Sequence, residues 1–422
     1  MYKNINIEKC LVAGLLLFSV AVRIIVLFTV ESIAHPNTWE YEQLANNFLE
    51  GKGLYYDYLN MRCRSTSMVL YSLICAWIYY LTSHSFLAVK LFQILISVFA
   101  CFLTYKFSRR LFGGRVGIIA LALISVHPGL VVYSIKLHPL TLDVLLFILS
   151  IFFFTSLLER EKIAANSILT GIFMGMALLT RATIGLFIPA VFLMILFRMR
   201  GDSGKVIQSI FGIIIGIAVV MSPLVIRNYH IFKRIVILPN DSGVSFWTGN
   251  NPNTIGTANT LEGKSVFDAA PEELIERTKG LDEFEHNRLF YSEAWDFIKK
   301  NPRRSLLLFS KKLYYFWWFS PTQGLNYSKR WLLGYKMYYI FVFPFAVFCA
   351  FIGMKFMPQR AKRAANVLIL FCVTISIAQA LYYVDGRHRW EVEPFILILS
   401  AYGISLLYVK FKEISACLKT KI

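Results

Sequence analysis

Acidic side chains stand at a few isolated places in this mostly apolar chain, and Asp143 is the most unusual of them. It lies inside the apolar run 142–148, shortly after Lys136, His138 and Pro139. Placing an ionisable group at membrane depth costs free energy, so such groups commonly mark substrate sites. A carboxylate here could accept a proton from a hydroxyl group. The alternative is a carboxylate that stabilises a helix N-terminus through the helix dipole, by about 0.3–1 kcal/mol.

Three arginines near the ends of apolar runs provide the opposite charge. Arg181 ends one run, and Arg387 and Arg389 flank His388 just before the last run. The N–H groups of arginine bind phosphate oxygens in pairs, so these residues are candidates for a phosphate site. Arg181 could instead extend its charge to the interface, and the other two could form structural ion pairs. The available partners are Asp385, Glu391 and Glu393.

The polar segment after the first apolar run adds further candidates. Glu40, Asp57 and Arg64 lie there, and residues 39–50 have the two faces of a helix that lies on a membrane surface. For Glu40 a solvated helix face is the favoured alternative. His138 alone does not indicate a metal site. The acidic residues permit a divalent cation, but no ligand spacing demands a metal or any other cofactor.

Composition indicates which elements must position these groups. Of the 422 residues, 57% are hydrophobic and 16% are charged, and several apolar runs are long enough to cross a bilayer. The formal net charge of +19 does not indicate nucleic-acid binding, because the basic residues cluster in short gaps between apolar runs. That distribution follows the positive-inside rule and places those gaps in the cytoplasm. The sequence therefore predicts an all-α polytopic membrane protein.

Alternating orientation of the runs predicts ten spans with both termini in the cytoplasm. The apolar stretches 67–81 and 305–319 break the alternation and are predicted to be interfacial helices. The loop 227–303 then lies outside, and its segments 235–238 and 244–248 are predicted strands of a small α/β region. The ten spans are 10–30, 86–105, 116–134, 142–158, 166–181, 183–198, 206–226, 333–355, 364–383 and 392–409.

Three regions follow from this arrangement. Residues 1–226 form an N-terminal membrane module whose first outer loop is 31–85. Residues 227–332 form an outer region with an interfacial helix, and residues 333–422 form the C-terminal spans. The candidate groups then converge on the outer face, beside the membrane interior.

Several short motifs share their order and spacing with one known family. The chain resembles the integral-membrane GT-C glycosyltransferases that use polyprenyl-phosphate sugars. It is most similar to a bacterial branch near glycosyltransferase family 39, with protein mannosyltransferases, lipid A aminoarabinose transferases and galacturonosyl transferases of the lipopolysaccharide core. The motifs are Trp39-Glu-Tyr with Gly51-Lys-Gly53, Arg109-Arg-Leu-Phe-Gly-Gly-Arg115, His127-Pro-Gly with Asp143, Leu178-Leu-Thr-Arg181, Arg227-Asn-Tyr with Gly249-Asn-Asn-Pro252, and Gly386-Arg-His-Arg389 with Glu393-Pro394.

The resemblance implies a GT-C fold and an inverting sugar transfer on the outer side of the membrane. It implies an acidic residue in each of the first two outer loops. The second matches Asp143, but the first position, four residues before Tyr41, is Asn37, and an amide cannot act as a general base. Either Glu40 or Asp57 substitutes, Asp143 carries the role, or activity is lost. The arginines that bind the lipid phosphate in the family map best onto Arg387 and Arg389, and less closely onto Arg64 and Arg181, with His138 beside them.

The predicted enzyme sits in a bacterial cytoplasmic membrane with its site facing outside. Its partners are a polyprenyl-phosphate-linked sugar donor, the lipid bilayer and a glycan, lipid or protein acceptor, and no nucleic acid. One alternative is a transporter or flippase of lipid-linked sugars, although such proteins tend to have symmetric halves and charges at the midplane. Another alternative, suggested by Asn37, is a catalytically inactive paralogue that binds lipid-linked sugar.

Overall fold

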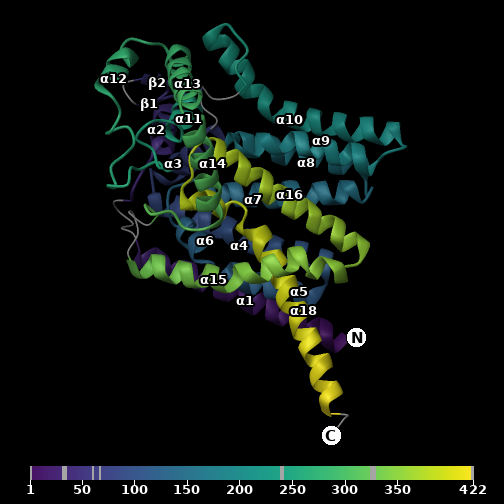
Figure 1. Cartoon of the computed structure of the whole chain (residues 1–422). Helices are drawn as coiled ribbons and strands as arrows, with labels where there is room; N and C mark the ends of the chain where they lie inside the picture. Colours follow the sequence, from purple (N-terminus) through teal and green to yellow (C-terminus); the bar gives the residue numbers. More distant parts are fainter. Residues whose placement is uncertain are drawn as a thin grey trace.

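Long helices build most of this protein. The structure is a computed structural model that describes residues 2–30, 36–58, 61–65, 68–237, 242–323 and 329–419. Within these residues, seven helices are long and apolar enough to cross a membrane, and most of them lie side by side in one bundle (Figure 1). They are α1 (Tyr2–Thr29), α4 (Phe86–Phe112), α7 (Leu140–Leu158), α10 (Ser203–Phe232), α15 (Lys329–Phe351), α16 (Gln359–Leu381) and α18 (Glu393–Lys419).

The three remaining predicted spans coincide with shorter helices. The first of them, α5 (Gly114–Ser125), has 12 residues, which extend about 18 Å at 1.5 Å per residue. The predicted span 116–134 is longer than α5 because Pro128 begins a separate helix, α6 (Pro128–Tyr133). The others are α8 (Ile163–Leu178) and α9 (Ile188–Arg198), preceded by the 3-10 helix η1 (Ala182–Phe187); a second 3-10 helix, η2 (Gly353–Phe356), follows α15.

Glycines allow α8 to approach α10 closely. A Cβ atom at Gly171 would lie 2.2 Å from the carbonyl oxygen of Ile213, and one at Gly216 would lie 2.4 Å from the carbonyl oxygen of Ile168. Small residues at such crossings let two backbones touch, which is how helices associate where no water is excluded. This contact fixes the end of α8, where Thr180 and Arg181 follow.

Shorter elements between the spans form a cap at one end of the bundle. In Figure 1 the strands and helices α2, α11, α12 and α13 lie together at the upper left. The predicted interfacial stretches 67–81 and 305–319 are helical in their described parts, as α3 and α14. The elements are α2 (Glu40–Leu49), β1 (Tyr56–Tyr58), β2 (Met61–Cys63), α3 (Val69–Thr82), α11 (Ser242–Thr248), α12 (Glu272–Thr278), α13 (Glu283–Lys300), α14 (Pro302–Trp317) and α17 (Gly386–Trp390).

The small sheet lies in a different loop from the one predicted. Strands β1 and β2 pair antiparallel, with Tyr56 opposite Cys63, so the sheet belongs to the connection between α1 and α4. The predicted strand 244–248 is wrong, because these residues form α11, whose Phe246 packs against Tyr291 and Trp295 of α13. The described part of the other predicted strand, 235–237, is not a strand, and residue 238 lies outside the described residues.

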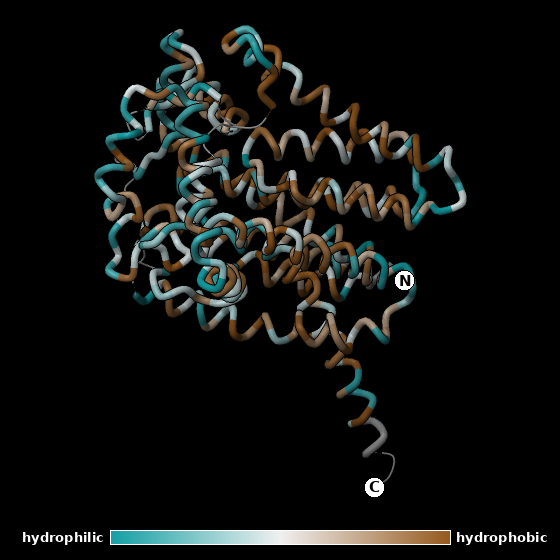
Figure 2. Tube along the Cα trace, turned by 45° about the horizontal axis from the view of Figure 1, so that its top comes forward, coloured by the Kyte–Doolittle hydropathy of each residue, from teal (hydrophilic) through white to brown (hydrophobic). Residues whose placement is uncertain are grey.

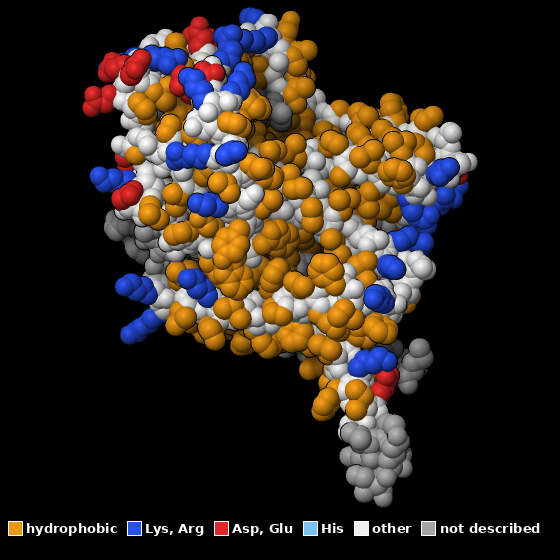
Figure 3. Space-filling view, in the orientation of Figure 1, with side chains coloured by type: hydrophobic (Ala, Val, Ile, Leu, Met, Phe, Trp, Pro, Cys, Tyr) orange, Lys and Arg blue, Asp and Glu red, His pale blue; other side chains and the backbone are white. Residues whose placement is uncertain are grey.

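Hydrophobic side chains cover the middle of the molecule. Figure 2 shows apolar residues along the bundle helices and polar residues at the cap and at the turns between helices. On the face shown in Figure 3, hydrophobic side chains form a broad band, with acidic and basic groups gathered over the cap and mostly basic groups at the opposite end of the bundle. This pattern is that of a multi-pass membrane protein.

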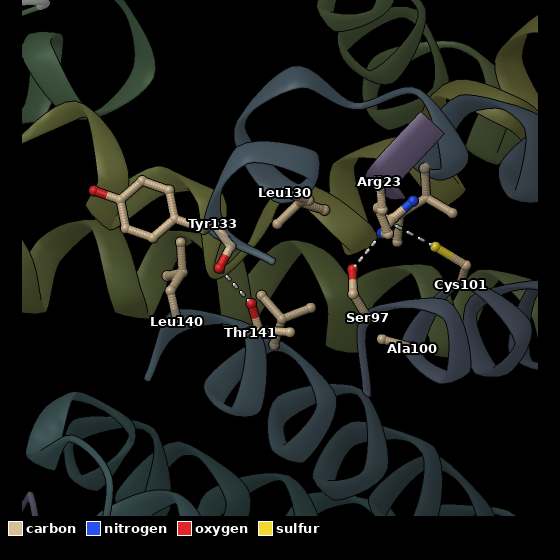
Figure 4. A pocket seen from close by; sticks show the side chains of 10 residues that line it. Arg23, Ser97, Ala100, Cys101, Leu130, Tyr133, Leu140 and Thr141 are labelled. Carbon is tan, nitrogen blue, oxygen red and sulfur yellow. Dashed lines mark hydrogen bonds between the residues drawn. The ribbon is translucent and has the colours of Figure 1, made fainter. Parts of the chain in front are cut away.

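Arg23 of α1 is a structural cation inside the bundle. Its side chain is fully buried and donates to the Ser97 Oγ at 2.9 Å (Figure 4). It also donates to the Ser19 Oγ at 2.6 Å and the Ser125 carbonyl at 3.2 Å. The adjoining cavity of about 10 Å³ is no larger than one water molecule. These contacts tie α1 to α4 and α5 and leave no room for a substrate.

Candidate functional site

The connection between α6 and α7 is held in place by Gln93 of α4 and is contacted by aromatic rings. The Gln93 side-chain amide donates to the Lys136 carbonyl at 2.6 Å, and the Leu140 amide donates to the His138 Nδ1 at 3.1 Å. The rings of Trp39 and Tyr41 meet the His138 ring edge-on, with centroids 5.6 and 5.5 Å away. The segment before α2 and the connection between α6 and α7 therefore touch at His138.

Asp143 lies in the first turn of α7, directly behind this contact. Its side chain is fully buried, and its Oδ1 accepts a hydrogen bond from the Thr180 hydroxyl at the end of α8. Its Oδ2 has no hydrogen-bond partner among the described residues. The charges of Arg181 and Glu391 act on it, so segments far apart in the sequence meet at this carboxylate.

Arg181 links the end of α8 to the segment before α18. Its Nη1 donates to the Glu391 Oε1. Glu391 is fully buried, whereas 19% of the Arg181 side chain is exposed, so Arg181 is the member of the pair that reaches the surface. Burial raises the pKa of Glu391 despite the opposing charges of Arg181 and Arg387. The Glu391 Oε2 also has no hydrogen-bond partner among the described residues.

Arg387 of α17 is a second, partly exposed cation near the same carboxylates. Its Nη2 lies 3.4 Å from the Asp385 Oδ2, and 27% of its side chain is exposed. Burial disfavours its charge, but Asp385 and neighbouring tyrosines outweigh burial and raise the pKa of Arg387. Burial, followed by the charges of Arg387 and Arg181, holds the pKa of His138 well below its usual value. His138 is therefore neutral at physiological pH.

Tyr41 contributes a hydroxyl to this group. Burial raises the pKa of Tyr41, and the charges that act on its hydroxyl include those of Arg181, Glu40, Arg387 and Asp143. A phenol that stays protonated is available as a hydrogen-bond donor. We call Tyr41, His138, Asp143, Arg181, Arg387 and Glu391 the outer cluster.

Arg389 takes a different part from Arg387, although the two are separated by one residue. Its Nε donates to the Glu393 Oε1 at 2.9 Å, its Nη1 donates to the Trp318 carbonyl at 3.0 Å, and its Nη2 donates to the Tyr335 hydroxyl. The side chain is 1% exposed. All three nitrogens are therefore engaged inside the protein, in the structural ion pair that the sequence left as the alternative.

The remaining sequence candidates lie at the edge of the cluster or outside it. Glu40 begins α2 beside Tyr41, and Asn37 is exposed two residues before Trp39. Asp57, on β1, accepts a bond from the Arg62 Nε at 3.2 Å, and the Arg64 backbone amide donates to Glu283 of α13. The structure thus brings together Asp143, Arg181, Arg387 and His138, with Glu40 alongside, and gives Asp57 and Arg64 partners in the cap.

The contacts of Glu391 with Arg181 and of Thr180 with Asp143 were not predicted from the sequence. The sequence suggests Glu391 only as an ion-pair partner of Arg387 or Arg389. Its bond to Arg181 joins residues 210 positions apart. A local signal existed, because Glu391 is an acidic residue next to an apolar span. For Thr180, which precedes Arg181 in the segment Leu178-Leu-Thr-Arg181, the sequence gives no such signal.

A divalent metal ion needs several protein ligands close together. Within the described residues, no group of three or more His, Cys, Asp or Glu side chains could hold one. Arg181 already places a positive charge beside both Asp143 and Glu391. The steps proposed below therefore use no metal.

Comparison with known proteins identifies the fold. The chain aligns over 100% of its length with the archaeal oligosaccharyltransferase AglB from Archaeoglobus fulgidus, solved with an inhibitory peptide and a dolichol-phosphate, at a TM-score of 0.57 and 14% identity. The chain has the GT-C fold. Residues 67–226 of this GT-C chain match the family model for dolichyl-phosphate-mannose-protein mannosyltransferase.

Two further structures are similar to the GT-C chain. The apo form of the same oligosaccharyltransferase aligns over 98% of this chain, with a TM-score of 0.56 and 15% identity. ArnT from Cupriavidus metallidurans, in the apo state, aligns over 93% of this chain and 77% of its own, with a TM-score of 0.41 and 13% identity. The chain spans about half the length of the oligosaccharyltransferase, at 52%. No curated protein matches it by sequence.

Proposed function

We propose that this chain is an inverting glycosyltransferase that takes a sugar from a polyprenyl-phosphate donor. The observation that carries the proposal is the outer cluster, where two partly exposed arginines lie beside two buried carboxylates at the ends of apolar helices. The GT-C fold supports it, and AglB, which shares that fold, was solved with a dolichol-phosphate. The acceptor is a hydroxyl group of a surface glycan, lipid or protein.

The donor phosphate binds to Arg387 and Arg181. Each of these guanidiniums pairs with one carboxylate, Arg181 with Glu391 and Arg387 with Asp385, and each side chain is partly exposed, so N–H groups remain for phosphate oxygens, unlike in Arg389. The lipid chain lies against apolar surface near the bundle. We assign it to an open groove of about 520 Å³ between α14 and α15, which is lined by Tyr315, Trp318 and Phe319 and lies beside Arg389.

Asp143 is the proposed general base. The acceptor oxygen attacks C1 of the sugar, its proton passes to the Asp143 Oδ2, and the bond between C1 and the phosphate oxygen breaks. The phosphate takes the bonding electrons, and Arg387 and Arg181 stabilise the charge that develops on it. The polyprenyl phosphate then leaves. Because Asp143 is fully buried and Arg181 is not, donor binding must draw Arg181 aside before the acceptor reaches the base.

Glu391 is proposed to supply the carboxylate that Asn37 cannot. If so, Glu391→Gln lowers turnover by about a hundredfold, since it removes the anion that holds Arg181 and orients the acceptor. Asn37→Asp, the matched control, leaves turnover within about twofold, because position 37 is exposed and lies outside the outer cluster. Both variants are compared in single-turnover assays. A large gain of activity in Asn37→Asp would instead show that the natural chain is an inactive paralogue.

The site is proposed to face the outside of a bacterial cytoplasmic membrane, with both termini in the cytoplasm. We also propose that regions 1–226 and 333–422 form the catalytic core and that 227–332 is an outer region attached to it. The mixed acidic and basic groups over the cap and the mostly basic groups at the opposite end support this orientation (Figure 3). A reporter fused after Ser83 should be active only outside the cytoplasm, and cytoplasmic activity there would contradict the topology.

The activity itself is tested with purified protein and a donor labelled in both its sugar and its lipid. A glycosyltransferase releases polyprenyl phosphate and moves the sugar label to an added acceptor. A flippase leaves the donor intact while moving it between leaflets of a vesicle, and an inactive paralogue binds it unchanged. Recovery of intact donor with every acceptor class would contradict the proposal.

A further inference from the structure

Lys312 of α14 is buried, is not a member of the outer cluster, and contacts two other segments. Its side chain is 1% exposed. Its Nζ lies 3.1 Å from the Gly249 carbonyl oxygen, 3.1 Å from the Asn250 Oδ1 and 2.9 Å from the Tyr382 carbonyl oxygen. A charged amine has three N–H donors, one for each of these three acceptors.

The Gly249-Asn-Asn-Pro252 turn has no role in the proposed chemistry. It contacts the same backbone segment as Lys312, at 381–382. The Asn250 amide donates to the Leu381 carbonyl at 3.0 Å, and the Val384 amide donates to the Gly256 carbonyl at 3.0 Å. A Cβ atom at residue 249 would lie 1.7 Å from the Tyr382 carbonyl oxygen, so only glycine fits there. We call Lys312, this turn and the backbone of 381–384 the loop anchor.

The loop anchor lies immediately before the segment that carries two members of the outer cluster. Val384 is followed by Asp385, and then by Arg387 and Glu391. We propose that Lys312 is a positioning residue that fixes the start of this segment, so that the outer region 227–332 holds Arg387 and Glu391 in place. Its consequence for catalysis rests on the proposed function, whereas the loop anchor itself does not.

The anchor should respond to pH near neutrality. Burial lowers the pKa of Lys312 to about 7, and no charged group contributes to that shift. The groups facing it are two carbonyls and an amide. The titratable groups on the facing segment are Tyr382, whose hydroxyl lies 3.4 Å from that of Tyr291, and Tyr383 and Asp385, which both interact with Arg387. When Lys312 loses its proton, one of its three acceptors loses its donor.

Hydrogen–deuterium exchange of the full chain in detergent micelles tests this inference without any activity assay. Relative to intrinsic exchange rates, amides of 381–391 should lose protection by about tenfold between about pH 6 and pH 8 in the natural chain. In Lys312→Met the same amides should be poorly protected at both pH values. Lys311→Met, the exposed neighbour, should behave like the natural chain.

Two results would overturn the inference. One is protection of 381–391 that does not change with pH in the natural chain, and the other is unchanged protection in Lys312→Met. If Lys312→Met does not fold, the pH series of the natural chain and of Lys311→Met decides alone. If the natural chain shows the pH-dependent protection of 381–391 but has no transferase activity, the proposed function is contradicted and the loop anchor is not.

Discussion

Replacing Asp143 with asparagine is expected to lower turnover by at least about a hundredfold while the protein still folds, because an amide cannot accept the acceptor's proton. The change is nearly isosteric, and the Thr180 hydroxyl can donate to the amide oxygen as it does to the carboxylate. Turnover is measured under single-turnover conditions at saturating donor, and folding is measured by thermal unfolding in detergent.

Asp57→Asn is the matched comparison for this prediction. Asp57 is an exposed carboxylate of the first outer loop whose partner is Arg62, so its loss should change turnover by less than about threefold. Near-normal transfer by Asp143→Asn would remove Asp143 from the catalytic centre. A hundredfold loss in Asp57→Asn instead would move the base to the first outer loop.

Replacing Arg387 with alanine is expected to weaken donor binding by about 10- to 100-fold, which corresponds to the hydrogen bonds between a guanidinium and a charged phosphate. Acceptor affinity should stay within about twofold. The loss of its partly exposed ion pair with Asp385 should cost little stability. Binding of a polyprenyl-phosphate analogue and the KM values for donor and acceptor measure these effects separately.

Arg389→Ala separates a phosphate ligand from a structural cation. It breaks the buried ion pair with Glu393, which typically destabilises a protein by about 3–5 kcal/mol, so the yield of folded protein should fall sharply. Arg387→Ala should be purified in normal amounts. A larger loss of acceptor than of donor affinity in Arg387→Ala would count against the phosphate role of this residue.

The fold was largely predictable because apolar runs and basic gaps are local signals. Each of the ten predicted spans coincides with a helix, and α5 is shorter than predicted because of Pro128. The predicted strand at 244–248 fails for a non-local reason. Its residues favour strands, but Phe246 finds its aromatic partners on α13, and that contact outweighs local preference.

The residues of the candidate site were largely predictable from the sequence. Which of its arginines form structural ion pairs and which remain partly exposed was not. Sequence shows that charges gather at the outer ends of apolar runs. It cannot show that all the side-chain nitrogens of Arg389 are bonded, because the partners Trp318 and Tyr335 come from distant positions. The partner of Arg181, Glu391, is also distant in sequence. For the same reason the carboxylate beside Asp143 comes from position 391 and not from position 37.

The most direct test of the account is a structure with a polyprenyl-phosphate sugar analogue bound. The account predicts that phosphate oxygens accept hydrogen bonds from Arg387 and Arg181, at about 2.7–2.9 Å, and that C1 of the sugar faces the Asp143 Oδ2. The lipid chain should follow the groove between α14 and α15. A phosphate held elsewhere, with Arg181 and Arg387 still paired only to Glu391 and Asp385, would contradict it.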